Sequence, residues 1–222
     1  MPLGIFNPGF LGKQYSRRQT NVKRFAKQFR VPGGFLGKIA GKIMYFENKK
    51  INKWTIDNLS LTNGQTVLEI GFGPGYAIGL IAERCPDCTI EGIDLSTKMK
   101  EETANKHEHL LNAGKLKLWR GDIADFNFPS EKYDRIFSVN NFPLWKNPQE
   151  TLARFPYALK NGGKVAITVQ PREEGDTNHT ARELGEQLEH GLKEAGLENI
   201  CISFKNDHPV LAVCATAEKP HR

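Results

Sequence analysis

A strand-like apolar run that leads directly into closely spaced glycines is the feature of the sequence best suited to chemistry. Residues 67–70 are followed by Gly71, Gly73 and Gly75, and a helix-like segment begins at Tyr76. Glycine tolerates positive φ angles and lets a ligand pack against the backbone with no Cβ atom in the way. The spacing therefore predicts a ligand-binding turn, with a simple tight turn between strand and helix as the alternative.

An acidic residue at the end of the next strand-like run supports a bound nucleoside. Asp94 follows Gly75 by about 20 residues, the offset at which a carboxylate reaches ribose hydroxyls in doubly wound sheets. Nicotinamide and flavin sites need a small residue three positions after Gly73, and Tyr76 stands there. The sequence thus indicates a nucleoside ligand other than a dinucleotide. The alternative for Asp94 is that it caps the helix expected from Ser96.

The elements that must position these residues alternate along the chain. Strands are expected at residues 66–70, 89–93, 115–119, 135–139 and 164–169, and helices at residues 76–84, 96–113 and 181–195. Strands that alternate with helices form βαβ units and a parallel sheet. Two further runs, residues 199–204 and 210–217, are too close together for a helical crossover and must form an antiparallel hairpin. We therefore predict an α/β fold with a doubly wound, mostly parallel seven-stranded sheet and a reversed C-terminal strand.

The first turn reads Glu-x-Gly-x-Gly-x-Gly from Glu69 to Gly75, and here the sequence resembles a known family. It is similar to the class I S-adenosylmethionine-dependent methyltransferases, and it looks closest to the small-molecule branch that includes the ubiquinone and menaquinone biosynthesis methyltransferases. The resemblance extends over residues 64–170, and the reversed last strand agrees with it. It implies a Rossmann-like methyltransferase fold, S-adenosyl-L-methionine as cofactor, and transfer of its methyl group to a small-molecule or lipid-like acceptor.

The resemblance also implies which residues bind the cofactor. Asp94 would accept both ribose hydroxyls, Asp122 would accept the adenine amino group, and the backbone carbonyl of Asn140 would meet the methionyl ammonium. Glu69 would hold the turn, or the ammonium through water. As an alternative, Asp122 could cap a turn. The complete expected set is Glu69, Gly71, Gly73, Gly75, Asp94, Leu95, Met99, Asp122, Ile123 and Asn140.

The acceptor side of the site has fewer signals in the sequence. Methyl transfer from a sulfonium needs mainly alignment in a dry pocket, so a general base is optional. Phe142 and Trp145 are predicted as apolar walls of the acceptor pocket, with core packing as the alternative, and Tyr45 is a third candidate contact. The segment 140–145 stands where relatives that methylate nucleobases or amides carry Asp/Asn-Pro-Pro-aromatic. Its single proline is displaced, which disfavours those substrates.

The histidines offer one candidate for an acceptor-side base. His179 lies in the loop expected after the strand at residues 164–169, and that loop borders the site in this architecture. The alternative is a polar loop without a catalytic role. His107, His109 and His190 are expected on helix surfaces, away from catalysis. The sequence identifies no other catalytic residue.

Four cysteines are too few to staple a chain of 222 residues, and a chain of this size can form a core without disulfides. Cys85 and Cys88 have the spacing of half a zinc site or of a redox pair. Because the pair follows an expected helix and does not open one, neither use is expected. No metal is predicted.

Positive charge is concentrated at the amino end of the chain. Residues 1–60 contain 12 Lys and Arg residues against two acidic residues, while the whole chain has a formal net charge of +6. Residues 35–50 have helical periodicity, with an apolar face opposite a row of lysines. We predict that residues 1–60 are a basic helical extension or lid of the methyltransferase domain at residues 61–222. Peripheral contact with an anionic surface is the alternative.

Composition excludes several other classes of protein. With 39% hydrophobic and 25% charged residues the chain is typical of globular proteins, and no apolar run is long enough for a membrane span. The amino end lacks the features of a secretory signal, so a cytoplasmic location is expected. Three functional alternatives stay open: an RNA or protein methyltransferase that uses the basic extension, a dinucleotide oxidoreductase, and a ligand sensor without catalysis. Nucleic acid is a less favoured partner than a small molecule.

Overall fold

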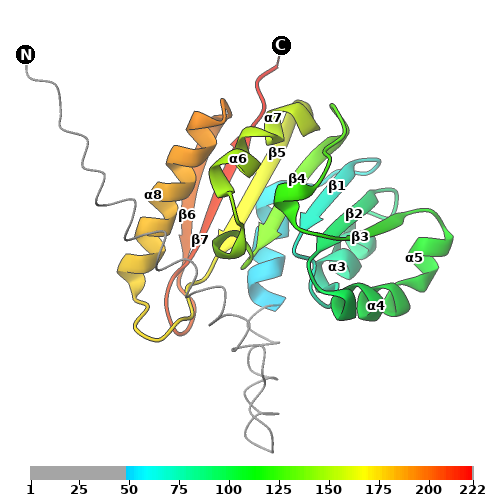
Figure 1. Ribbon diagram of the computed structural model, residues 1–222, viewed down its shortest axis with the longest axis horizontal. Coiled ribbons are helices and arrows are strands. Elements are labelled where there is room, and N and C mark those ends of the chain that lie inside the picture. Colours follow the sequence, from blue (N-terminus) through cyan, green and yellow to red (C-terminus); the bar gives the residue numbers. More distant parts are fainter. Residues whose placement is uncertain (1–48, 222) are drawn as a thin grey trace, which may run out of the picture. The chain divides into compact units, whose positions relative to one another are not determined.

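The computed structural model describes residues 49–221, which contain one sheet of seven strands (Figure 1). The strands are β1 (Thr66–Ile70), β2 (Thr89–Asp94), β3 (Leu116–Arg120), β4 (Tyr133–Val139), β5 (Leu159–Val169), β6 (Glu198–Lys205) and β7 (Ala212–Glu218). Their order across the sheet is β3-β2-β1-β4-β5-β7-β6. Strands β1 to β5 are parallel, and β7 runs antiparallel between β5 and β6. The predicted α/β fold with a reversed last strand is confirmed.

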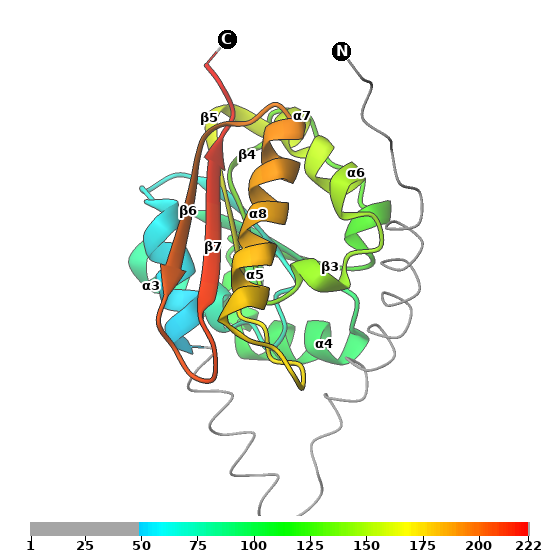
Figure 2. The same cartoon turned by 90° about the vertical axis from the view of Figure 1, so that its left-hand side faces the viewer.

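Helices pack on both faces of the sheet, because successive residues of a strand point to opposite sides. The helices are α3 (Tyr76–Arg84), α4 (Thr97–Lys106), α5 (Glu108–Asn112), α6 (Pro148–Ala153), α7 (Phe155–Ala158), α8 (Asn178–Glu194), a helix at residues 49–59, and the short turns η1 (Ile123–Asp125) and η2 (Phe142–Leu144). In β1, Val67 belongs to the apolar cluster with Ile56 and Ile78, whereas Leu68 belongs to the cluster with Leu152. Figure 2 shows the helix at residues 49–59 and α8 on opposite sides of the sheet.

Two expected helices differ from the structure. The single helix expected at residues 96–113 is broken into α4 and α5 at His107, whose backbone has φ −117° and ψ 31°. Helix α8 begins at Asn178, earlier than the expected residue 181, because the Thr177 hydroxyl accepts a hydrogen bond from the N–H of His179. Both differences arise at helix ends, where side-chain and tertiary hydrogen bonds decide the boundary.

The first and last residues of the chain, 1–48 and 222, lie outside the described residues. Tyr45 and most of the amphipathic segment expected at residues 35–50 are therefore not described. Of the predicted extension, residues 49–59 form a helix in which Ile51 and Leu59 are buried. The hydroxyl of Thr55 in this helix donates a hydrogen bond of 2.7 Å to the hydroxyl of Thr168 in β5. None of the described helices is both long and apolar enough to cross a membrane.

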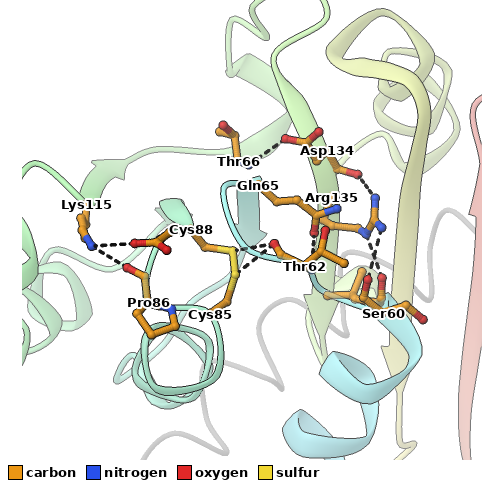
Figure 3. Close-up of a disulfide and its surroundings, with 12 residues drawn as sticks. Ser60, Thr62, Gln65, Thr66, Cys85, Pro86, Cys88, Lys115, Asp134 and Arg135 are labelled. Carbon is orange, nitrogen blue, oxygen red and sulfur yellow. Dashed lines mark hydrogen bonds and ion pairs between the residues drawn. A yellow bond between two sulfur atoms is a disulfide. The ribbon is translucent and has the colours of Figure 1, made fainter.

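Cys85 and Cys88 form a disulfide between the end of α3 and the start of β2 (Figure 3). The sequence analysis, which expected neither a zinc site nor a redox pair at these two cysteines, did not predict this disulfide. The N–H of Cys88 donates to the carbonyl oxygen of Cys85 at 3.0 Å, and this turn brings the two side chains together. Both sulfur atoms lie close to the carbonyl oxygen of Thr62, at 3.1 and 3.3 Å. The disulfide is at the amino ends of the strands, so the carboxyl ends do not depend on it directly.

Candidate functional site

The glycine turn joins β1 to α3 at the carboxyl edge of the parallel strands. Gly71, Gly73 and Gly75 have φ angles of 78°, 50° and 70°, in the left-handed region that favours glycine. A Cβ atom on Gly71 would also lie 2.4 Å from the side chain of Asn141. The predicted turn is present, and only a hydrogen atom fits between Gly71 and the loop that follows β4.

Asp94, at the end of β2, fixes this turn through its carboxylate. One oxygen, Oδ2, accepts a hydrogen bond of 2.9 Å from the N–H of Gly73. The other, Oδ1, accepts one of 2.8 Å from the N–H of Ser96. The N-cap of α4 is the Ser96 hydroxyl, which accepts from the N–H of Met99. Asp94 therefore connects the ends of two neighbouring strands, and it is not the cap of α4.

A cleft opens beside the turn, at the carboxyl ends of β1, β2 and β3. Five residues of the expected cofactor set line it, namely Gly71, Asp94, Leu95, Asp122 and Ile123. The remaining lining residues are Ile70, Ile93, Gly121, Asn141, Leu144 and Trp145. Leu95 is 57% exposed, which leaves a large apolar side chain uncovered at the cleft. Ligands of doubly wound sheets bind at this edge.

Glu69 and Asn140 lie next to the cleft without lining it. The Glu69 side chain is buried, and its Oε2 atom has no hydrogen-bond partner among the described residues. Burial, and secondly the charge of Asp94, raise the pKa of Glu69 well above its usual value. Asn140 has a φ of 52°, and its side-chain oxygen accepts a hydrogen bond from the N–H of Gln170. The fold thus holds an unpartnered carboxylate oxygen behind the turn.

Asp122 caps a turn, the alternative that the sequence offered for it, and it also lines the cleft. Its Oδ1 atom accepts from the N–H of Ala124 and caps η1, while its side chain lines the cleft. Its Oδ2 atom forms an ion pair of 2.8 Å with Lys146, and the hydrogen bond in this pair raises the pKa of the lysine. Lys146 was missed by the sequence analysis. The signal that could have found it is its place in the segment after β4, next to Trp145.

Of the candidate acceptor residues, Phe142 and Trp145 are in contact, whereas His179 does not line the cleft. Trp145 lines the cleft and its indole N–H donates to Oδ1 of Asn141 at 2.8 Å, whereas Phe142 packs against it with ring centroids 5.2 Å apart. Both side chains are buried and belong to the apolar core. His179 lies exposed in the first turn of α8, not in a loop, and it does not line the cleft.

His107 corrects the expectation that it lies on a helix surface. Its side chain is buried, because the break between α4 and α5 turns it inward. The Nε2 atom lies 2.8 Å from the carbonyl oxygen of Gly75 in the glycine turn. Burial lowers the pKa of His107, with smaller contributions of the same sign from Lys106 and His109 and an opposing one from the bond to Gly75. The structure therefore places a histidine behind the site, where sequence periodicity alone placed it in solvent.

Comparison with known proteins shows which proteins this chain is similar to. Residues 67–163 match the methyltransferase domain family. The uncharacterized methyltransferase YdaC of Bacillus subtilis (strain 168) is 41% identical over 182 residues, which cover 82% of this chain and 98% of YdaC. Malonyl-[acyl-carrier protein] O-methyltransferase 1 of Ilyobacter polytropus is 34% identical over 103 residues, which cover 46% of this chain and 37% of that protein.

A solved structure supports the fold. Phosphoethanolamine N-methyltransferase 2 of Haemonchus contortus, in complex with S-adenosyl-L-methionine, has a TM-score of 0.62 and 18% identity to this chain. The similar region covers 77% of this chain and 52% of that protein. At this identity the likeness concerns the fold alone, so the acceptor of that enzyme is not transferred.

The unpartnered carboxylate of Glu69 generates a prediction about stability. Its pKa in the folded protein is raised above the unfolded value, so the folded state binds more protons above about pH 4.5 and stability falls as the pH rises. We expect Glu69→Gln, which removes this charge, to increase the free energy of unfolding at pH 8 by on the order of 1 kcal/mol, and by less at pH 5. Urea unfolding of the ligand-free protein at both pH values measures the difference.

A second buried glutamate provides the matched control for this prediction. Glu91 in β2 accepts hydrogen bonds from Lys132 and Tyr133, so its charge is partnered. Glu91→Gln should destabilise the protein, because it weakens both bonds. A loss of stability in Glu69→Gln equal to that in Glu91→Gln would mean that Glu69 is not an unpartnered charge.

Proposed function

The chain belongs to the class I S-adenosylmethionine-dependent methyltransferases, and from this we propose that it holds S-adenosylmethionine at the glycine turn and methylates a small-molecule or lipid-like acceptor. The observation that carries the proposal is the convergence of Gly71, Asp94 and Asp122 on one cleft at the carboxyl edge of the sheet. This is the edge at which such sheets bind their ligands.

The residues around the cleft fit this cofactor chemically. The carboxylate of Asp94 offers about four lone-pair positions, of which two accept backbone N–H groups, so it can still accept ribose hydroxyls. The uncovered Leu95 side chain suits one face of a purine ring. The buried Oε2 atom of Glu69 has no partner among the described residues, and a methionyl ammonium, directly or through water, would provide one. Asp94, Leu95 and Glu69 all belong to the cofactor-binding set that the family resemblance implies.

The contribution of the protein to the reaction is mainly alignment. S-adenosylmethionine supplies a sulfonium whose methyl group a nucleophile can take while a neutral thioether leaves. Glu69 and Asp94 would fix the methionyl and ribose parts of the cofactor, while Leu144 and Trp145 keep that side of the cleft apolar and exclude water. Holding the nucleophile in line with the methyl group supplies most of the acceleration, so no general base is required for an electron-rich acceptor.

The acceptor class rests on the relatives and on the walls of the cleft. Relatives are named as methyltransferases of malonyl-[acyl-carrier protein] and of fatty acids, both of which carry an apolar chain or thioester beside a carboxyl group. The apolar side chains of Leu144 and Trp145 favour such a ligand over a strongly charged polymer. The finer resemblance to ubiquinone and menaquinone methyltransferases stays a prediction, as does a role for His179 as base.

Replacement of Asp94 tests the position of the cofactor. We expect Asp94→Ala to weaken binding of S-adenosylmethionine by about 1–3 kcal/mol, because ribose hydroxyls and the N–H of Gly73 lose their acceptor. Titration calorimetry measures the affinity. Asp87→Ala is the matched control, since Asp87 lies exposed at the opposite end of β2. Equal affinities in both variants would contradict the proposed site.

The acceptor class can be tested directly with a labelled methyl group. The full chain is incubated with methyl-labelled S-adenosylmethionine and, separately, with fatty acids and acyl carriers, small amines, and bulk RNA. We expect label in the fatty-acid or acyl pool, and we expect Asp94→Ala to reduce it at least about tenfold. Label confined to RNA or to added protein would instead support the alternative in which the basic extension recruits a macromolecule.

The residues before the described part form the proposed lid. Gly34, Gly37 and Gly41 each lower helix propensity by about 1 kcal/mol, which suits a segment that is ordered only by its ligand. We expect a chain without residues 1–47 to bind S-adenosylmethionine as before but to lose turnover of a soluble acceptor. The deletion ends there because the helix at residues 49–59 packs into the core. Full turnover with loss of binding to anionic vesicles would identify a membrane tether instead.

A further inference from the structure

Two buried side chains from the α4 region lie directly behind the glycine turn. The hydroxyl of Thr103 donates a hydrogen bond of 2.8 Å to the carbonyl oxygen of Gly73. Nε2 of His107 lies 2.8 Å from the carbonyl oxygen of Gly75. The two side chains are four residues apart, the spacing that places them on one face of a helix. Together they bind the carbonyl groups of Gly73 and Gly75, while Asp94 binds the N–H group of Gly73.

The hydrogen bond between His107 and Gly75 determines which ring nitrogen of His107 carries a proton. A carbonyl oxygen only accepts, so Nε2 must carry a proton. Burial lowers the pKa of His107, which favours the neutral ring at neutral pH. The ring is therefore a neutral donor, fixed in one tautomer by the turn that it supports.

Close packing connects the same side chains to α3. A Cβ atom on Gly75 would lie 2.6 Å from Cγ2 of Thr103 and 3.2 Å from Cδ2 of His107. A Cβ atom on Gly79 would lie 3.0 Å from Cε1 of His107. Glycine inside a helix costs about 1 kcal/mol relative to alanine. This contact explains why a glycine stands at position 79, outside the glycine motif: Gly79 leaves room for the His107 ring, which contacts the carbonyl group of Gly75.

We propose that Thr103 and His107 are positioning residues of the cofactor site, and that they set its affinity without touching the cofactor. This inference rests on the proposed binding of S-adenosylmethionine at the turn. If the Thr103 hydroxyl is removed, the carbonyl group of Gly73 loses a hydrogen bond, and if the His107 ring is removed, the carbonyl group of Gly75 keeps the longer bond of 3.3 Å from the N–H of Gly79. The peptide groups of the turn are then less tightly held and can rotate toward other donors. A rotated turn would shift the N–H of Gly73 away from Asp94 and change the wall of the cleft.

Substitutions that remove or keep each donor test the proposal. Thr103→Val keeps the size of the side chain and removes the hydroxyl, whereas Thr103→Ser keeps the hydroxyl. His107→Ala removes the ring, whereas His107→Gln keeps a donor near the position of Nε2. We expect the first member of each pair to raise the Kd for S-adenosylmethionine about tenfold, and the second to stay within about threefold of wild type. Calorimetry on the folded variants measures the Kd, and thermal unfolding without ligand measures stability.

Measuring the Kd and the melting temperature separately distinguishes a residue that positions the turn from one that only stabilises the fold. Residues that only stabilise the fold would lower the melting temperature and leave the Kd of the folded protein unchanged, which would overturn the proposal. His109→Ala is the matched control, because His109 lies exposed in α5, two residues after His107. Its Kd should equal that of the wild type.

Gly79 provides a second test that does not depend on His107→Ala folding well. Gly79→Ala should raise the Kd for S-adenosylmethionine by displacing the ring from Gly75. In the His107→Gln background, whose side chain is narrower, the same change should have a smaller effect. Equal effects in both backgrounds would contradict the proposed link between Gly79 and the turn.

Asp94→Ala distinguishes this inference from the function on which it rests. If Asp94→Ala weakens binding while Thr103→Val and His107→Ala do not, the inference is wrong and the proposed site stands. If Asp94→Ala also leaves the Kd unchanged, the proposed site is wrong and the inference falls with it.

Discussion

The site depends first on the carboxylate of Asp94, which binds the N–H groups of Gly73 and Ser96. These two bonds join the turn after β1 to the end of β2, so the carboxyl ends of neighbouring parallel strands have a fixed spacing. The carbonyl groups of the turn are bound from the other side by Thr103 and His107. The three glycines of the turn, which have no side chains to fix them, are thus held in one conformation by contacts from neighbouring elements. That rigidity lets a flexible sequence form a defined wall of the cleft.

The same arrangement carries an electrostatic cost at Glu69. Its carboxylate is buried beside Asp94 and has an oxygen atom without a partner among the described residues. A charge in such a place destabilises the protein, since the described residues offer this oxygen atom no hydrogen-bond donor. A bound cationic group would compensate this charge. Part of the free energy of cofactor binding would then come from removing an electrostatic cost that the fold already carries. Stability and binding oppose each other here, as is common at functional sites.

The sequence predicted the parts of the molecule that depend on local patterns. The glycine turn, the alternation of strands and helices, and the final hairpin all follow from residue types and spacing, and the structure contains them. The periodicity of residues 96–113 is continuous, so it could not reveal the break at His107, whose side chain contacts the carbonyl oxygen of Gly75. The disulfide of Cys85 escaped prediction for a similar reason: it needs the geometry of the turn between α3 and β2. Periodicity along the chain carries no information on such side-chain contacts.

The acceptor side was harder to predict because it shares residues with the cofactor side. Asn141 follows β4, its side chain lies where a Cβ atom of Gly71 would be, and its oxygen accepts the indole N–H of Trp145. A change of Trp145 that suited a new acceptor would release Asn141 and so disturb the glycine turn. The loop after β4 can therefore vary only in ways that keep Asn141 in place. Under the proposed function, Leu144 and Trp145 are the apolar side chains after β4 that line the cleft and could select the acceptor, and neither belongs to a motif from which a substrate could be predicted.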